Sequence, residues 1–124
     1  MARGQRILIV EDEAITSMVI QDVVEGLGCE AVGPASRVPQ ALALADDAGL
    51  TGAVLDVNLH GEPVYPVADR LARRQVPFFF LTGYGAQAIP PAHGDRLVLT
   101  KPFHPPELAK MLQQTFSLAT EPAD

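Results

Sequence analysis

The stretch GAVLDVNLHG, residues 52–61, leads a run of apolar residues directly into an acid. Ala53, Val54 and Leu55 are typical of a buried strand, and Asp56 follows them at once. A single acid in this position can simply cap a turn or the next helix. Its meaning therefore depends on which other residues the fold brings to the same end of the strand.

Strand-like and helix-like segments alternate along the rest of the chain. Apolar runs predict strands over residues 6–10, 30–33, 53–57, 76–81 and 96–100. Apolar residues at helical spacing predict helices over residues 13–27, 36–49, 64–71 and 108–116. This alternation predicts an α/β fold with a five-stranded, mainly parallel sheet and right-handed crossovers.

The predicted helix boundaries rest on a few specific residues. The first helix is predicted from apolar residues at helical spacing, namely Ile15, Met18, Val19, Val23 and Leu27. Gly28 stands where this helix would end, and Ser36 is the expected N-cap of the second helix. Residues 85–89 have room for one helical turn, because Pro90 and Pro91 must end it.

The composition predicts one acidic domain. With 124 residues and 48% hydrophobic content, residues 1–124 are expected to fold around a single core. The formal net charge of -6 argues against direct nucleic-acid binding, which requires a basic face. No apolar run is long enough for a targeting segment or membrane span, so we expect a cytoplasmic protein. The single cysteine, Cys29, excludes an internal disulfide and is expected to be buried.

Polar side chains stand at the carboxyl ends of four of the five predicted strands. They are those of Glu11 and Asp12, then Asp56, then Thr82, and finally Lys101, with Gly83 and Pro102 directly after the last two. Each has an ordinary interpretation as a cap, a turn residue or a solvated lysine. In a parallel sheet, however, the carboxyl ends of the strands form the ligand-binding edge. Four such coincidences at one edge favour a functional site over four independent accidents.

The acids of this set are suited to a divalent cation. Neighbouring carboxylates repel one another, and Mg²⁺, or alternatively Mn²⁺, prefers oxygen ligands. Asp12 and Asp56 are the predicted carboxylate ligands, with the backbone carbonyl of Asn58 as a third and Glu11 acting through a metal-bound water. His60 can either touch this site or be an ordinary solvated loop residue.

The complete set is suited to phosphoryl transfer onto a carboxylate. Asp56 is the predicted nucleophile, and Lys101 would neutralise a phosphoryl oxygen. The Thr82 hydroxyl would donate to another oxygen, and Gly83 would let the backbone approach the phosphoryl group. On this interpretation the strand before Asp56 presents a nucleophile rather than a turn cap.

In order and spacing, these residues resemble the receiver domain of bacterial two-component response regulators, over essentially the whole chain. The resemblance rests on the Glu11-Asp12 pair, Asp56 in DVNLHG, Thr82, and TKPF at residues 100–103. It implies a doubly wound sheet of order 2-1-3-4-5, a single receiver domain over residues 1–124 without an output domain, and a cis peptide before Pro102. It also implies a histidine kinase or histidine phosphotransfer protein as phosphodonor. A receiver catalyses only its own phosphorylation and slow dephosphorylation, so it is not a turnover enzyme.

One departure concerns how the domain would switch. Many receivers carry Tyr or Phe three residues before the lysine, where this chain has Val98. The stretch PFFFLTGYG, residues 77–85, resembles a subgroup of single-domain receivers with a PFxFATGY-like signature, with Leu81 in place of Ala. We therefore predict that Tyr84 takes over part of the switch role; the alternative is that it packs on the loop. The short segment before Pro90 favours a monomer.

Three functions from different classes remain open. The first is a phosphoacceptor switch whose output is contact with a downstream protein partner or phosphate relay, without nucleic acid or membrane. The second is a degenerate receiver that binds partners without phosphorylation, although all its acidic, Thr and Lys positions are filled. The third is a haloacid-dehalogenase-like phosphatase, which requires a second Asp two residues after the nucleophile, where Asn58 stands. A flavin-binding module is disfavoured because no Ser/Thr-rich loop follows the first strand.

Overall fold

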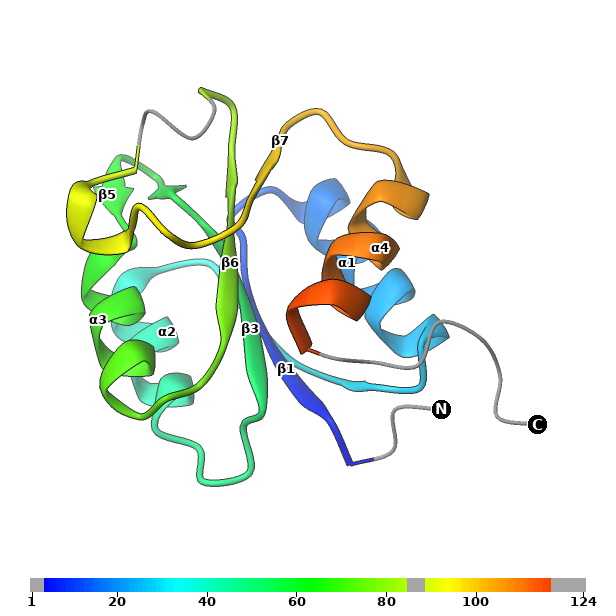
Figure 1. Cartoon of the computed structure of the whole chain (residues 1–124), viewed down its shortest axis with the longest axis horizontal. Helices are drawn as coiled ribbons and strands as arrows, with labels where there is room; N and C mark the ends of the chain where they lie inside the picture. The colour runs from blue at the N-terminus through cyan, green and yellow to red at the C-terminus, as the bar shows by residue number, and fades with distance from the viewer. Residues whose placement is uncertain (1–3, 85–88, 117–124) are drawn as a thin grey trace.

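The structure, a computed structural model, describes residues 4–84 and 89–116. Its central feature is a five-stranded parallel sheet in the order β2-β1-β3-β6-β7, which confirms the predicted 2-1-3-4-5 order (Figure 1). The strands are β1 (Arg6–Val10), β2 (Glu30–Ala35), β3 (Gly52–Asp56), β6 (Phe78–Thr82) and β7 (Val98–Thr100). Each lies within two residues of its predicted range.

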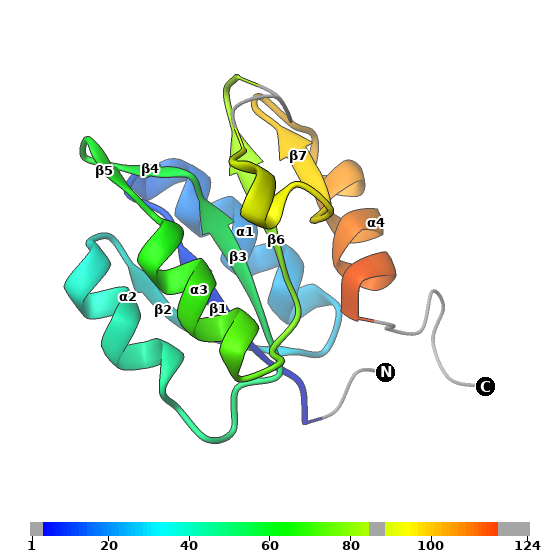
Figure 2. The same cartoon turned by 60° about the vertical axis from the view of Figure 1, so that its left-hand side comes forward.

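Helices cover both faces of the sheet, as a doubly wound fold requires (Figure 2). One face carries α1 (Ala14–Gly26) and α4 (Pro105–Phe116), and the other carries α2 (Val38–Ala45) and α3 (Tyr65–Arg73). A small antiparallel hairpin, β4 (Asn58–Leu59) and β5 (Glu62–Pro63), connects β3 to α3. Within the described residues, no helix is long and apolar enough to cross a membrane.

The inner strands are buried on both faces because their side chains alternate between two cores. In β6, Phe78 and Phe80 pack toward α2 and α3, whereas Phe79 and Leu81 pack toward α1 and α4. All five residues of β3 are buried, including the terminal Asp56. This continuous burial explains why the strands read as unbroken apolar runs in the sequence.

Two details of the local structure differ from the sequence-based expectation. Strand β2 continues past Gly33 to Ala35, through a cis Gly33–Pro34 peptide, and the Ala35 carbonyl accepts a hydrogen bond from the Glu11 N–H at 3.0 Å. The Ser36 N-cap prediction is wrong, because Arg37 occupies the N-cap of α2 and provides no side-chain cap. The predicted burial of Cys29 is confirmed, and this burial raises the pKa of its thiol.

Helix α1 is confirmed, but the apolar stripe that predicted it does not all face the core. Ile15 is 79% exposed and Met18 is 61% exposed, whereas Ser17, Ile20 and Val24 are buried. Both sets have helical spacing, so periodicity alone leaves the rotation of the helix about its axis undetermined. The structure shows that a serine lies on the inner face while two large apolar side chains face solvent.

A 3₁₀ turn, η2 (Pro91–His93), lies in the connection between β6 and β7 and packs on the sheet; the predicted helical turn at 85–89 falls largely outside the described residues. His93 is buried, and its ring stacks on Tyr65 at 6.1 Å and meets Phe78 and Phe80 edge-on at 6.0 and 5.9 Å between centroids. Its Nε2 lies 2.8 Å from a carboxylate oxygen of Asp69 in α3. One imidazole therefore fastens this segment to α3.

The packing of β3 against α4 provides a stability test at Gly52. A Cβ atom at Gly52 would lie 2.6 Å from Cε1 and 2.7 Å from Cδ1 of the Phe116 ring. We expect Gly52→Ala to lower the free energy of unfolding by about 1–3 kcal/mol, because the buried ring must move. Urea denaturation measures the change.

Gly26→Ala is the matched control, because a Cβ there has no atom within 4 Å. Since Gly26 is helical, alanine should leave stability unchanged or raise it by up to about 1 kcal/mol. Equal stabilities of the two variants would contradict the proposed packing constraint.

Candidate functional site

The residues predicted from the strand ends converge at one edge of the sheet. Glu11 follows β1, Asp56 ends β3, Thr82 ends β6 and Lys101 follows β7. The Lys101 Nζ lies 2.9 Å from Glu11 Oε1 and 3.2 Å from Asp56 Oδ2. Three strands thus bring one ammonium group and two buried carboxylates into direct contact.

Three carboxylates form the core of the site. Oxygens of Glu11, Asp12 and Asp56 all lie within 4.8 Å of one another. Glu11 and Asp56 are only 2% and 6% exposed, whereas Asp12 is partly open to solvent. This set of oxygen donors fits a hard divalent cation, which would offset the repulsion among the acids.

Burial makes the inner carboxyls reluctant to ionise. It raises the pKa of Glu11 to about 7, against the opposing effect of the Lys101 ammonium group. Burial also raises the pKa of Asp56, although Lys101 again favours the charged form. For Asp12, burial favours a higher pKa, but hydrogen bonds outweigh this effect and lower the pKa. The largest of these contributions comes from the His60 N–H. The acid nearest the solvent is thus the one most readily charged.

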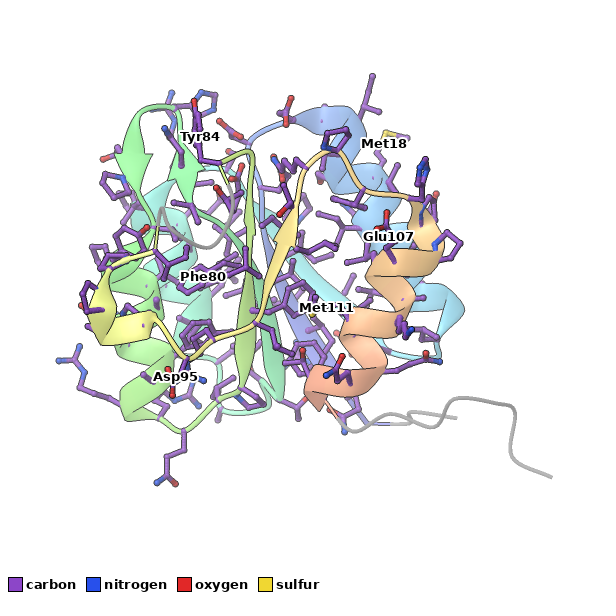
Figure 3. The ribbon with its side chains drawn as sticks, turned by 45° about the horizontal axis from the view of Figure 1, so that its top comes forward. Met18, Phe80, Tyr84, Asp95, Glu107 and Met111 are labelled. Carbon is purple, nitrogen blue, oxygen red and sulfur yellow. The ribbon has the colours of Figure 1, made fainter. Side chains whose placement is uncertain are left out.

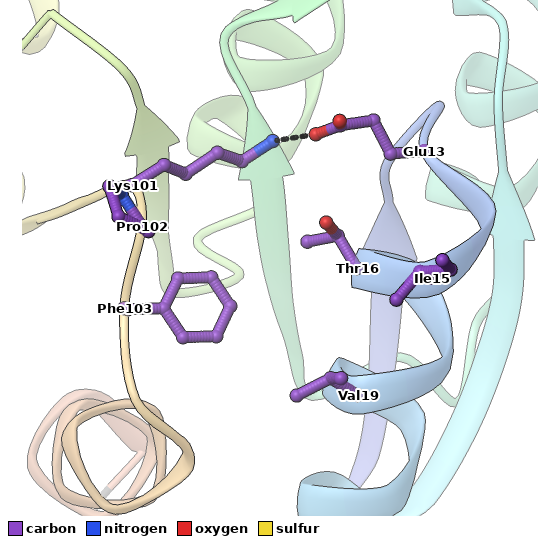
Figure 4. A pocket seen from close by; sticks show the side chains of 7 residues that line it. All are labelled: Glu13, Ile15, Thr16, Val19, Lys101, Pro102 and Phe103. Atoms are coloured by element: carbon purple, nitrogen blue, oxygen red, sulfur yellow. Dashed lines mark hydrogen bonds and ion pairs between the residues drawn. The ribbon is translucent and has the colours of Figure 1, made fainter.

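Lys101 is held by three acids rather than two. Burial alone would lower its pKa, but Glu11, Asp56 and Glu13 raise it above the usual value. Glu13 Oε1 lies 3.1 Å from the Lys101 Nζ, an ion pair drawn in Figure 4. Glu13 was not among the predicted site residues, although its place directly after the acidic pair was a usable clue. The predicted cis peptide between Lys101 and Pro102 is confirmed.

The end of β6 places a hydroxyl beside the acids. Thr82 is buried, and its Oγ1 accepts a hydrogen bond from the Tyr84 N–H at 3.0 Å. The Tyr84 side chain is 77% exposed at the rim of the site (Figure 3). A Cβ atom on Gly83 would have no atom within 4 Å, so packing in this structure does not itself require glycine there.

The β4–β5 hairpin closes the site beside Asp12. The Asn58 N–H donates to Asp56 Oδ1 at 3.4 Å, and the Asn58 side-chain oxygen accepts from the Gly61 N–H at 2.7 Å. The His60 N–H donates to Asp12 Oδ2 at 3.0 Å. Of the two interpretations of His60, the structure supports contact with the site. The Asn58 carbonyl as a metal ligand stays a prediction.

A pocket of about 380 Å³ adjoins the site between α1 and the segment after β7 (Figure 4). Ile15 and Val19 line it on one side, and Phe103 lines the other. The Glu13–Lys101 ion pair lies at its edge. The pocket therefore combines apolar side chains with the charged residues at the edge of the site.

Comparison with known proteins places this geometry in context. No protein-family model matches the chain. The structure of SdrG from Sphingomonas melonis Fr1 is 43% identical, with a TM-score of 0.79, and the match covers 90% of this chain and 96% of SdrG. A BeF3-activated conformation of SdrG, from Pseudomonas melonis Fr1, matches with 42% identity and a TM-score of 0.74, over 90% of this chain and 96% of that one.

Two further relatives extend the comparison. The phyllosphere-induced regulator PhyR of Methylorubrum extorquens is 30% identical over 115 residues, or 87% of this chain; the chain spans only 42% of that curated relative. The receiver domain of the sensor histidine kinase PA1611 from Pseudomonas aeruginosa PAO1, solved with a magnesium ion in its active-site cleft, is 25% identical with a TM-score of 0.76, over 92% of this chain and 98% of that domain.

The similarity in structure and the extent of the matches answer the question raised by the acid at the end of β3. Similarity runs through nearly the whole of SdrG and of the PA1611 receiver, and not through an isolated motif. The chain belongs to the receiver-domain family of two-component response regulators, whose members are signalling switches.

Proposed function

We propose that the chain is a phosphoacceptor switch in which Asp56 receives a phosphoryl group from a histidine kinase or histidine phosphotransfer protein. The observation that carries this proposal is the contact between the Asp56 carboxylate and the Lys101 ammonium group at 3.2 Å, inside a ring of acids. An Asp56 oxygen attacks the phosphorus, the bond from phosphorus to the donor's imidazole nitrogen breaks, and that nitrogen leaves with the electron pair.

Each neighbouring group has a role in this step. Asp12, Asp56 and the Asn58 carbonyl would hold Mg²⁺ or Mn²⁺, with Glu11 acting through a bound water; the PA1611 receiver carries magnesium in its own cleft. When bound, the ion supplies positive charge to the phosphoryl oxygens. Lys101 moves from carboxylate to phosphoryl oxygen as a point charge. Thr82 accepts its hydrogen bond from the Tyr84 N–H, so its hydroxyl proton is available to a phosphoryl oxygen.

The nucleophile is fixed in orientation before the donor arrives. One Asp56 oxygen accepts from the Asn58 N–H and the other from Lys101. Since no carboxylate stands at Asn58, the chain has no general acid two residues after the nucleophile. We therefore propose slow self-dephosphorylation, and no turnover of a separate substrate.

The donor would approach over the exposed part of α1. Asp56 is only 6% exposed, so a phosphohistidine must enter from the rim of the site. Ile15 and Met18 offer uncovered apolar surface at the start of α1, and Ile15 also lines the pocket beside Lys101 (Figure 4). We propose that a cytoplasmic donor docks on this surface. We also propose that the chain acts as a monomer. Its output would be contact with a downstream protein or relay of the phosphoryl group.

Phosphorylation with acetyl phosphate tests the nucleophile. With Mg²⁺, intact mass should show one phosphate adduct on the wild type and none on Asp56→Asn, because the amide cannot attack. Lys101→Ala should form the adduct at least about tenfold more slowly, because the transferring charge loses its partner. An adduct of undiminished yield on Asp56→Asn would refute the assignment of Asp56.

The raised pKa of Glu11 predicts a pH dependence of stability without metal. Its usual value is 4.5 and its value in the fold is about 7, so between these limits the folded chain retains a proton that the unfolded chain has lost. Stability should therefore fall as pH rises through this window, by up to about 1.4 kcal/mol per pH unit.

Glu11→Gln should remove this contribution. In EDTA, the unfolding free energy of Glu11→Gln relative to wild type should grow from about pH 5 to about pH 7.5, as measured by urea denaturation. Glu107→Gln is the control, because Glu107 is exposed at the start of α4. Parallel pH profiles for wild type and Glu11→Gln would contradict the buried, proton-holding carboxyl.

The switch role of Tyr84 rests on its link to Thr82 and on the valine at position 98. On phosphorylation the site gains a group of about −1.5 to −2 charge, which attracts the Thr82 hydroxyl. Because Tyr84 N–H is bonded to that hydroxyl, movement of Thr82 displaces Tyr84. We expect Tyr84→Ala to phosphorylate within about twofold of the wild-type rate, and to reduce the amide chemical-shift changes beyond β6 that beryllofluoride induces. Unchanged shifts would contradict the role.

A further inference from the structure

We infer that the imidazole of His60 is an additional ligand of the metal site, which strengthens its binding of divalent ions that accept a nitrogen ligand more readily than Mg²⁺ does: Co²⁺ and Ni²⁺ most, and Mn²⁺ to a smaller extent. The inference rests on the proposed function, because the carboxylates of Glu11, Asp12 and Asp56 must hold the ion first. It concerns the metal preference of the site rather than the transfer of the phosphoryl group.

Two contacts hold His60 against the acidic cluster. Its backbone N–H donates to Asp12 Oδ2 at 3.0 Å, and its ring Nδ1 lies 3.8 Å from the same oxygen. The ring is 45% exposed, so it can turn without disturbing the core. A nitrogen donor therefore stands beside the most readily charged acid of the site.

The loop that carries His60 is anchored on both sides. Leu59, the preceding residue, is fully buried and pairs with Glu62 across the β4–β5 hairpin. Gly61, with φ of 87°, donates its N–H to the Asn58 side chain. His60 itself has φ of 51°, a left-handed conformation that Asn and Gly adopt readily. These constraints fix the backbone of His60 at the tip of the hairpin.

The separation of the His60 ring from Asp12 suits a shared ion, although the ring lies outside the group of three mutually close carboxylates and must rotate toward the ion. Adjacent ligands of an octahedral ion with bonds of about 2.1 Å lie roughly 3 Å apart. The 3.8 Å between Nδ1 and Asp12 Oδ2 is close to this value, and rotation of the ring can shorten it. Imidazole favours Co²⁺ and Ni²⁺, whereas Mg²⁺ favours oxygen ligands, so His60 should strengthen binding of the former without being needed for Mg²⁺.

Neither of the other histidines has this relation to the acids. His93 is buried under η2 and bonds to Asp69 of α3. His104 precedes α4 and is exposed, with its N–H bonded to Glu107. Within the described residues, only His60 combines a ring nitrogen with direct contact to the acidic cluster.

The test uses the untagged chain and metal ions alone, without a phosphodonor. Electron spin-echo spectroscopy of bound Mn²⁺ should show nitrogen modulation from a coordinated imidazole in the wild type. The modulation should vanish in His60→Asn and His60→Gly, two variants whose residues suit the left-handed backbone. Calorimetric titration should show Ni²⁺ affinity at least about tenfold lower in both variants and Mg²⁺ affinity within about twofold. His104→Asn is the control and should match wild type.

The outcomes separate this inference from the proposed function. If Mn²⁺ binds at the acids, with paramagnetic broadening around Asp12 and Asp56, but shows no imidazole modulation, the His60 inference is wrong and the metal site stands. If modulation persists in both His60 variants, another nitrogen is the ligand and the inference is also wrong. If neither Mn²⁺ nor Mg²⁺ binds at the acids, the inference falls together with the metal site of the proposed function.

Discussion

One ammonium group, the Lys101 Nζ, contacts three carboxylates at the end of a parallel sheet. The rest of the structure holds these charged groups together. Buried carboxyls are stable only when a partner offsets their charge or a proton neutralises it. The apolar strands β1, β3 and β6 are packed on both faces, so they hold Glu11, Asp56 and Thr82 without the freedom to separate. The rigid core thus keeps the buried carboxylates close together and in contact with Lys101, in an arrangement that favours binding of a cation.

The sheet and the convergence of the site were predictable because both follow from strong constraints. A strand covered on both faces must be apolar throughout, which marked β6, and parallel strands share one carboxyl edge, which brought Asp56 and Lys101 together. The rotation of α1 was not predictable, since Ser17 faces inward while Ile15 faces solvent. A buried serine does not belong to the apolar pattern of the helix, so the sequence does not distinguish it from the exposed polar residues beside it.

The remaining differences arise from contacts between segments far apart in the chain. Glu13 reaches Lys101 across 88 positions, and His60 reaches Asp12 across 48. Each of these contacts depends on the position of a loop or of the first turn of a helix in the folded chain. Local sequence propensity does not determine that position. Strand β2 likewise extends to Ala35, whose carbonyl accepts a hydrogen bond from the Glu11 N–H beyond β1. Tertiary placement, rather than residue type, decides these details.

The fastening of η2 by His93 has a consequence for how evolution can adjust this edge of the sheet. A covering helix is attached through many side chains and changes its hold only through several substitutions. Here the buried Ile89 and the Arg96 guanidinium over Phe78 contribute, but the link to α3 depends on the His93 ring, packed among Tyr65, Phe78 and Phe80, and on its hydrogen bond to Asp69. Asp69 lies on the outer side of α3, with most of its side chain in solvent. A single mutation at this surface position therefore removes one polar contact between η2 and α3 while the apolar packing of His93 stays intact.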